Sequence, residues 1–323
     1  MIHPIPAGTR DVLPDEMREL RAIRDRLRTS FENAGYGEVK TPAVEYESVL
    51  RAGDDRLAGA AFRTFDDHGQ VLVMRSDMTI PIARLVATRF SAAGPEPLRL
   101  CYSGCAYRTA ARGTGQQREI LQSGVELVGV EGADGEAEVI ELTLAALDGA
   151  GLSRHRVGLG DGALYRSLLE TLEVPVASRG GLLERLSRRD LVGLERLATE
   201  AELPPDARRL LVRLPELRGG PEVLELADGP VAGAADGLRA LHAALERRGV
   251  ADRVIFDLGM VRELGYYTGA VYEVYDPAVG FTLGGGGRYD DLIGRFGAGR
   301  PACGIGLDIA RVHIAQAAEE GLR

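Results

Sequence analysis

The sequence predicts an α+β fold, in which a mainly antiparallel sheet is flanked by helices and interrupted once by a helical insertion. Two observations lead to this prediction. Strand-like segments occur up to about residue 160 and again after residue 250. The stretch between them is rich in Leu, Arg, Glu and Ala, with glycine and proline breaks that favour short helices. We therefore expect a core of residues 1–160 and 251–323, with residues 161–250 as an inserted helical subdomain.

The first expected element is a long amphipathic helix that starts after Asp15. Its apolar side chains recur every three or four residues, which places them in one stripe along the helix. Gly35 and Gly37 end it. The stripe consists of Met17, Leu20, Ile23, Leu27 and Phe31.

The rest of the first core segment alternates between strand and helix patterns. Asp67, His68 and Gly69 separate two apolar runs, which predicts a β-hairpin of residues 62–65 and 71–74. The other expected elements are a strand over 39–44 that contains Pro42, a helical stretch from 45, a helix over 77–90, strands over 98–108 and 120–130, a helix over 134–147 and a strand over 155–159.

The second core segment is marked by four consecutive glycines, Gly284–Gly287. The run lacks the Lys-Ser/Thr of a phosphate-binding P-loop. Close approach between strands, or a pocket floor, explains it better. Around this run we expect strands over 253–260 and 270–275, then a helix, a strand and a last helix over 308–320.

Bulk composition excludes several classes of function. The net charge is −9, and no long Lys/Arg run is present, so no nucleic-acid partner is expected. No apolar stretch approaches the ~20 residues needed to span a bilayer, and no signal-peptide pattern opens the chain, so no membrane association is expected. The three cysteines are typical of a reduced cytosolic protein, which predicts a cytoplasmic location.

Neither a metal site nor a catalytic triad is expected. Cys101 and Cys105 have no second pair of ligands and no nearby histidine, so buried thiols in a strand are the simpler explanation. The five histidines are scattered along the chain. The sequence therefore predicts no metal and no cofactor.

Six segments, taken in order, resemble the core of class II aminoacyl-tRNA synthetases in its histidyl version. Each alone is weak evidence, but their order and spacing from Ala7 to about His313 make the resemblance specific. Leu98–Gly129 resembles the second motif, the hairpin that binds ATP in that family. The others are Thr41-Pro42 with Glu45, RSDMT at 75–79, VRELGYYT at 261–268, GGGGRYD at 284–290 and GIGLDIAR at 304–311.

The second motif departs from the synthetase pattern where ATP would bind. Ala110 and Ala111 stand where synthetases have a glutamate and an arginine, and Gln116 replaces another arginine. Ile120 replaces the ring that stacks on adenine, a loss of ~1–3 kcal/mol by analogy with base stacking. The chain also ends soon after the third motif, so no anticodon-binding domain is expected. The residual nucleotide-site residues are Arg118 and Arg311.

This combination resembles the regulatory subunits of ATP phosphoribosyltransferase, synthetase paralogues that pair with a short catalytic subunit at the first step of histidine biosynthesis. The resemblance implies a non-catalytic protein that activates its partner, binds histidine for feedback inhibition and forms a homodimer within a hetero-oligomer. The striped helix and the Pro42 strand resemble the dimer interface. Gly265 is a departure, since many relatives have Asp there. The alternatives are a truncated histidyl-tRNA synthetase-like enzyme that activates histidine, and a dimeric module without either function.

The resemblance and the chemistry of histidine together suggest a binding site. Arg108 suits the carboxylate, because a guanidinium can bind it through two hydrogen bonds. The ammonium would contact Asp77, Thr79 and Gln122, and the imidazole would contact Glu126, Arg262, Tyr266 and Tyr267. Two alternatives stay open: Gln122 and Glu126 could form one face of an exposed strand, and Asp77 and Thr79 could cap a helix.

Overall fold

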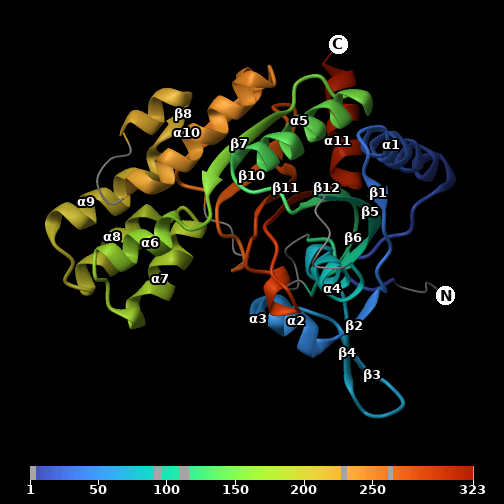
Figure 1. The fold of residues 1–323 in the computed structure, drawn as a ribbon, viewed down its shortest axis with the longest axis horizontal. Coiled ribbons are helices and arrows are strands. Elements are labelled where there is room, and N and C mark those ends of the chain that lie inside the picture. The colour runs from blue at the N-terminus through green and yellow to red at the C-terminus, as the bar shows by residue number, and fades with distance from the viewer. Residues whose placement is uncertain (1–4, 91–96, 110–115, 227–230, 261–264, 323) are drawn as a thin grey trace.

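The computed structural model describes residues 5–90, 97–109, 116–226, 231–260 and 265–322. Its strands are β1 (Gly37–Glu38), β2 (Val44–Tyr46), β3 (Arg63–Phe65), β4 (Val71–Met74), β5 (Leu98–Tyr107), β6 (Glu119–Val128), β7 (Arg156–Asp161), β8 (Arg218–Gly219), β9 (Val254–Asp257), β10 (Ala270–Tyr275), β11 (Thr282–Arg288) and β12 (Ala302–Asp308). Nine of them form one sheet in the order β1-β5-β6-β12-β11-β10-β7-β9-β8. The smaller sheet, β2-β4-β3, lies below it in Figure 1.

The large sheet is mainly antiparallel, as predicted. Only β1 with β5 and β7 with β9 pair in parallel among the described strands. The predicted hairpin of β3 and β4 is also confirmed. The chain leaves the sheet after β7 and returns with β8 and β9, so the core is assembled from both ends of the sequence.

The helices are α1 (Pro14–Asn33), α2 (Glu47–Gly53), α3 (Asp55–Gly59), α4 (Thr79–Arg89), α5 (Ala133–Gly149), α6 (Leu164–Thr171), α7 (Val176–Ser187), α8 (Leu191–Glu200), α9 (Pro205–Arg213), α10 (Ala232–Arg247) and α11 (Ile309–Gly321). Helices α1, α5 and α11 pack together on one face of the large sheet (Figure 1). The apolar stripe of α1 is buried in this layer, with Leu20, Ile23, Leu27 and Phe31 inside the single chain. The stripe therefore packs internally, and a subunit contact needs another surface.

Helices α6 to α10 form the lobe at the left of Figure 1. The prediction of helices alone is wrong at one point, because β8 leaves this lobe to pair with β9 at the sheet edge. This pairing gives backbone groups at the sheet edge hydrogen-bond partners. One cluster of buried apolar side chains extends from Leu159 of the sheet to Leu168, Leu194 and Leu211 of the lobe. The division into separate domains stays a prediction.

Two further expectations are wrong in detail. Residues 39–43 are not a strand, because Pro42 has no N–H to donate. In addition, Arg75 Nη1 donates hydrogen bonds to the carbonyls of Thr41 and Pro42, at 2.7 and 3.2 Å. The helix expected after the glycine strand is only a 3₁₀ turn, Ile293–Arg295. Gly294 and Gly297 lie in and just after that turn, and glycine disfavours a continued helix.

The glycine run is explained by close approach between strands, as predicted. A Cβ on Gly284 would lie 2.2 Å from the carbonyl oxygen of Gly306, and one on Gly286 would lie 1.9 Å from that of Gly304. Both glycines are on β11 and both carbonyls are on β12. Any side chain at these positions would separate the two strands.

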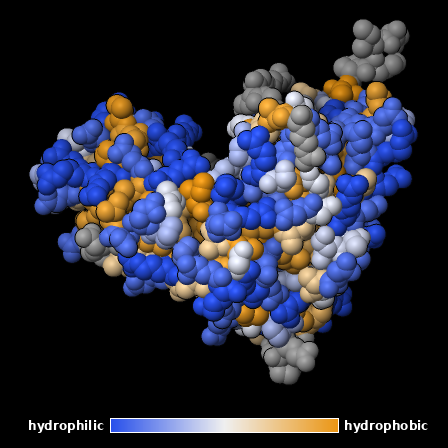
Figure 2. Space-filling view, turned by 90° about the horizontal axis from the view of Figure 1, so that it is seen from above, coloured by the Kyte–Doolittle hydropathy of each residue, from blue (hydrophilic) through white to orange (hydrophobic). Residues whose placement is uncertain are grey.

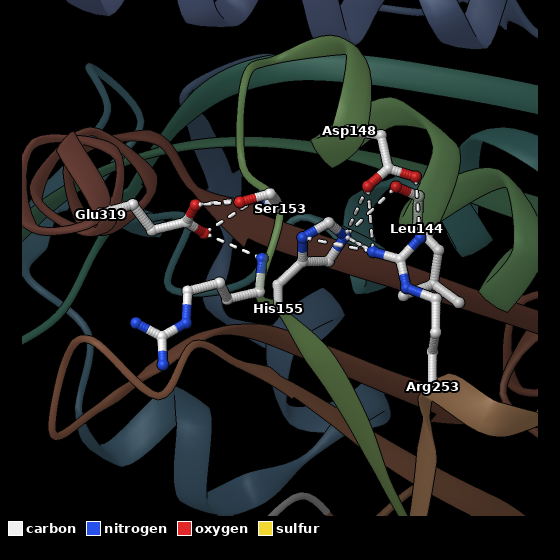
Figure 3. A network of polar contacts seen from close by, with 7 residues as sticks. Leu144, Asp148, Ser153, His155, Arg253 and Glu319 are labelled. Carbon is white, nitrogen blue, oxygen red and sulfur yellow. Dashed lines mark hydrogen bonds and ion pairs between the residues drawn. The ribbon is translucent and has the colours of Figure 1, made fainter. Parts of the chain in front are cut away.

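The end of α11 is held to the start of β7 by a polar network, shown in Figure 3. Glu319 accepts hydrogen bonds from the backbone N–H groups of Ser153 and Arg154, at 3.0 Å each, and from Ser153 Oγ at 2.5 Å. Beside it, Arg253 donates to Asp148 and to the buried ring of His155. Burial opposes ionisation of Glu319, but the hydrogen bonds from Ser153 and Arg154, together with the neighbouring Asp276, outweigh it and lower its pKa to about 2.

We expect Glu319→Gln to destabilise the fold by about 1–3 kcal/mol, because an amide offers one acceptor oxygen where the carboxylate uses two. Denaturant unfolding near pH 7 measures this, with Glu320→Gln on the exposed side of the same turn as the control. The folded pKa of Glu319 is depressed, so its contribution should be lost as the pH falls towards about 2. Equal free energies of unfolding for Glu319→Gln and Glu320→Gln would contradict this stabilising role of Glu319.

The surface is mostly polar. Figure 2 shows one face on which hydrophilic residues predominate and hydrophobic residues lie in small groups. No helix in the described parts of the chain is both long and apolar enough to cross a bilayer.

Candidate binding site

A cavity of about 220 Å³ lies where the large sheet meets the start of α4 and the segment before β10. Strand pairing assembles it: β6 pairs with β12 so that Gln122 lies opposite Asp308, and β11 pairs with β12 so that Gly285 lies opposite Gly306. The polar side chains on its wall are Asp77, Thr79, Tyr102, Arg108, Gln122, Tyr266, Tyr267, Thr282, Asp308 and Arg311.

Asp77 is buried at the entrance to α4. Its Oδ1 accepts a hydrogen bond from the Ile80 N–H at 2.7 Å, and its Oδ2 accepts one from the Tyr266 hydroxyl at 3.2 Å. Burial raises the pKa of this carboxyl, although the backbone bond and the charge of Arg108 oppose the shift. The helix-cap alternative is therefore correct for Asp77, which also lines the cavity, but not for Thr79, which donates its hydroxyl to Glu126.

Glu126 lies next to the cavity, with 1% of its surface exposed. Thr79, which lines the cavity, donates its hydroxyl to Glu126 Oε1 at 2.8 Å, and the Tyr289 hydroxyl donates to Oε2. A Cβ on Gly304 would overlap this carboxylate, so glycine is required opposite it. Burial raises the pKa of Glu126 to about 8, and the two hydroxyl groups lower it only in part. Glu126 is thus not on an exposed strand face.

Arg108 provides a positive charge on the cavity wall. Its Nε donates to the carbonyl of Ser76 at 2.8 Å. This bond fixes the side chain while using one of its five N–H groups. Within the described residues the terminal nitrogens have no hydrogen bond, so they can bind a carboxylate.

Arg311 is a second cation at the rim of the cavity. Its Nη1 donates to the Thr282 carbonyl at 2.8 Å, and its Nε lies 3.3 Å from Asp308 Oδ2. Asp308 also caps α11 through the Ala310 N–H. The guanidinium is therefore held by the protein itself.

The cavity brings together most of the residues that the sequence singled out. Asp77, Thr79, Arg108, Gln122, Tyr266, Tyr267 and Arg311 line it, and Glu126 contacts Thr79 behind its wall. Arg118 does not line it; its guanidinium lies 6.0 Å from the centre of the Phe62 ring. Arg262, Ala110 and Ala111 lie outside the described residues.

Sequence reasoning missed four polar residues of the site. Tyr289 hydrogen-bonds Glu126, and Tyr102, Thr282 and Asp308 line the wall. Three of them lie inside segments that were quoted for the resemblance: Tyr102 in Leu98–Gly129, Tyr289 in GGGGRYD and Asp308 in GIGLDIAR. Tyr102 could have been found from its place on β5, two residues before Gly104, which pairs with Gln122. Alternation along the strand then puts Tyr102 on the same face.

The arrangement suits a small zwitterion. Arg108 can bind a carboxylate, and Asp77 with Gln122 can bind an ammonium. Glu126, Thr79 and the tyrosines form a deeper polar end that can hydrogen-bond a ring. A buried ligand must have each of its polar groups matched in this way.

Comparison with known proteins gives the same picture. The family model described as histidyl-tRNA synthetase matches residues 8–312. The ATP phosphoribosyltransferase regulatory subunit of Moorella thermoacetica is 40% identical over 318 residues, covering 97% of this chain and 82% of that protein.

Two solved structures are similar over nearly the whole chain. An ATP phosphoribosyltransferase regulatory subunit/histidyl-tRNA synthetase from Bacillus halodurans C has a TM-score of 0.88 and 33% identity, covering 98% of this chain and 84% of that one. A histidine–tRNA ligase subunit from Alicyclobacillus acidocaldarius has a TM-score of 0.84 and 31% identity, covering 99% of both chains. The predicted synthetase-like fold is therefore confirmed.

Proposed function

The chain belongs to the family of ATP phosphoribosyltransferase regulatory subunits, and we propose that it is the histidine sensor of such a complex. It has no catalytic activity of its own, activates a short catalytic subunit and binds histidine for feedback inhibition. The observation that supports this most directly is the cavity that places Arg108, Asp77 and Gln122 around a space of about 220 Å³, with Glu126 behind it.

In this proposal each polar group of histidine has a partner. Arg108 binds the carboxylate, and Asp77, Thr79 and Gln122 receive the ammonium. The imidazole lies towards Glu126 and the pair Tyr266 and Tyr267, whose rings are 4.8 Å apart. Arg262 completes the set, as the resemblance to histidyl synthetases implies.

A histidine-activating enzyme is the competing proposal, and the nucleotide side of the site disfavours it. Ile120 lines the cavity where an aromatic ring would stack on adenine. Arg311 is held by Thr282 and Asp308, and Arg118 lies beside Phe62 outside the cavity lining. Adenylation needs cations that face the phosphates as pyrophosphate leaves.

We expect the purified protein to bind histidine without exchanging pyrophosphate into ATP. Isothermal titration with histidine and a histidine-dependent exchange assay measure the two properties, with a histidyl-tRNA synthetase as the positive control. Exchange at synthetase-like rates would overturn the regulatory proposal. Weak ATP binding without exchange supports it, since Arg108 and Arg311 still line the cavity.

The site is placed to influence the helical lobe. Arg108 also lines a second cleft, of about 700 Å³, between the core and helices α6 and α7. Arg166 and Arg188 from that lobe face the same cleft. A ligand held by Arg108 can therefore act on the position of the lobe, provided that it binds two arrangements with different affinity.

The protein is also proposed to be a homodimer within the hetero-oligomer. The stripe of α1 is buried, but β2 presents Val44 and Tyr46 on its outer face, 40% and 46% exposed. Leu72 and Met74 of β4 lie opposite them and are half-buried. This apolar sheet face can pair with its copy in a two-fold contact.

We expect the isolated protein to sediment as a dimer at micromolar concentration and Tyr46→Lys to shift it towards monomer. Burying a lysine charge in an apolar contact is unfavourable. Val192→Lys, at an exposed position on α8, is the control and should leave the dimer intact. A monomeric wild-type protein would contradict the dimer, and an unchanged Tyr46→Lys dimer would contradict this face.

A further inference from the structure

Glu126 is a buried acid without a counter-ion in the described part of the chain. Its two oxygens accept hydrogen bonds from Thr79 and Tyr289, and no described Lys, Arg or His pairs with it. Hydroxyl groups orient a carboxylate but bring no positive charge. Among the described residues, an ionised Glu126 in the empty site would therefore be a buried charge without a compensating cation, which is strongly unfavourable.

The groups around Glu126 that the structure describes do not supply the missing charge. Asp77, before α4, raises its pKa further. Arg108 acts on Asp77 and not on Glu126. The other described titratable neighbours stay neutral, because burial raises their pKa values. They come from β5, β10, β12 and the segments before β10 and after β11: Tyr102, Tyr266, Tyr272, Tyr289 and Cys303.

We infer that Glu126 carries a proton in the empty site and transfers it to the ring of bound histidine, so that the ligand is held as an imidazolium–carboxylate pair. The inference rests on the proposed function. In the transfer the O–H bond of the carboxylic acid breaks and its electron pair stays on oxygen. The proton forms an N–H bond with the lone pair of an imidazole nitrogen. No proton is exchanged with water, and no further reactant is needed.

The ligand thereby supplies a positive charge that the described residues around Glu126 do not. An imidazole has an ordinary pKa of about 6.5, close enough to the raised pKa of Glu126, about 8, for transfer between them. Once the ring is charged, the attraction across one hydrogen bond in a site of low dielectric favours the pair. Thr79 and Tyr289 then stabilise the carboxylate that remains. The site selects a ring by its basicity as well as by its shape.

The direct test is nitrogen-15 NMR of ring-labelled histidine bound to the protein at about pH 8, where the ring of free histidine is neutral. We expect both ring nitrogens to be protonated in the wild-type complex. Glu126→Gln keeps the shape of the protonated acid but has no proton to transfer, so its bound ring should be neutral. A neutral ring in the wild-type complex would overturn the inference. Failure of histidine to bind the wild type at all would overturn the proposed function, a separate outcome.

A second ligand tests basicity alone. In 1,2,4-triazole-3-alanine the ring has the size of imidazole but is much less basic. We expect the wild type to bind it at least about tenfold more weakly than histidine, and Glu126→Gln to discriminate less between the two. Equal affinity of the wild type for both would count against proton transfer.

The empty protein gives a measurement that does not depend on any ligand. The carboxyl of Glu126 keeps its proton up to about pH 8 when folded, whereas its ordinary pKa is 4.5. Between these values the folded state binds more protons than the unfolded state, so stability falls as the pH rises. Glu126→Gln lacks this contribution, so from pH 5 to 8 the wild type should lose stability relative to the variant in denaturant unfolding. Glu136, whose pKa is raised to about 7, is present in both proteins and cancels. If the stabilities of the wild type and of Glu126→Gln changed with pH in parallel, the acid would already be ionised in the empty site.

Discussion

Glu126→Ala should move the histidine inhibition curve of the reconstituted complex to concentrations higher by about one to two decades. The substitution removes the group that faces the imidazole and leaves a donor of the buried ligand unpaired, which costs about 1–3 kcal/mol of binding. It also leaves the hydroxyls of Thr79 and Tyr289 without their acceptor. The measurement is the rate of phosphoribosyl transfer against histidine concentration, with each complex normalised to its own rate without histidine.

Glu119→Ala is the matched control for this experiment. Glu119 lies on the same strand, β6, but is exposed and does not line the cavity. Its inhibition curve should coincide with that of the wild type. If the curve of Glu126→Ala also coincides with the wild type, histidine acts elsewhere, and this cavity is not the sensor.

The parts of the site that lie on one strand could be predicted from the sequence. Gln122 and Glu126 are four residues apart, which places them on one face of β6 whatever that strand packs against. Their environments could not be predicted. Gln122 lines the cavity while Glu126 is held behind it, because Tyr289, just after β11, and Gly304, on β12, contact Glu126 from more than 160 residues further along the chain. These contacts depend on the register of the whole sheet.

The fold was predictable where a local pattern determined the structure, and not where distant groups did. The period of α1 and the turn before β4 are local, and both were predicted. The irregular segment at Pro42 depends on Arg75, more than 30 residues away, which donates a hydrogen bond to the Pro42 carbonyl. The segment β8 is a strand only because it pairs with β9 at the edge of the sheet. Such segments have no signal of their own, since their conformation is set by tertiary contacts.

Gly286→Ala should strongly destabilise the sheet, with a loss of about 3 kcal/mol or more in the free energy of unfolding. The new Cβ would lie 1.9 Å from the carbonyl oxygen of Gly304 and 2.8 Å from the Cα of Ile305. Both are backbone atoms of β12, which is paired on its other side with β6 and cannot move alone. Denaturant unfolding of the purified variant measures the loss.

Gly237→Ala separates this clash from the general effect of replacing glycine. Gly237 is exposed inside helix α10, and a Cβ there would meet no atom within 4 Å. Since alanine favours a helix over glycine, this control should stabilise the protein by about 0.5–1 kcal/mol. Opposite signs for the two variants are therefore expected. A Gly286→Ala protein as stable as the wild type would mean that β11 and β12 are further apart than described. The cavity floor that they form with Gly285 and Gly306 would then have a different shape.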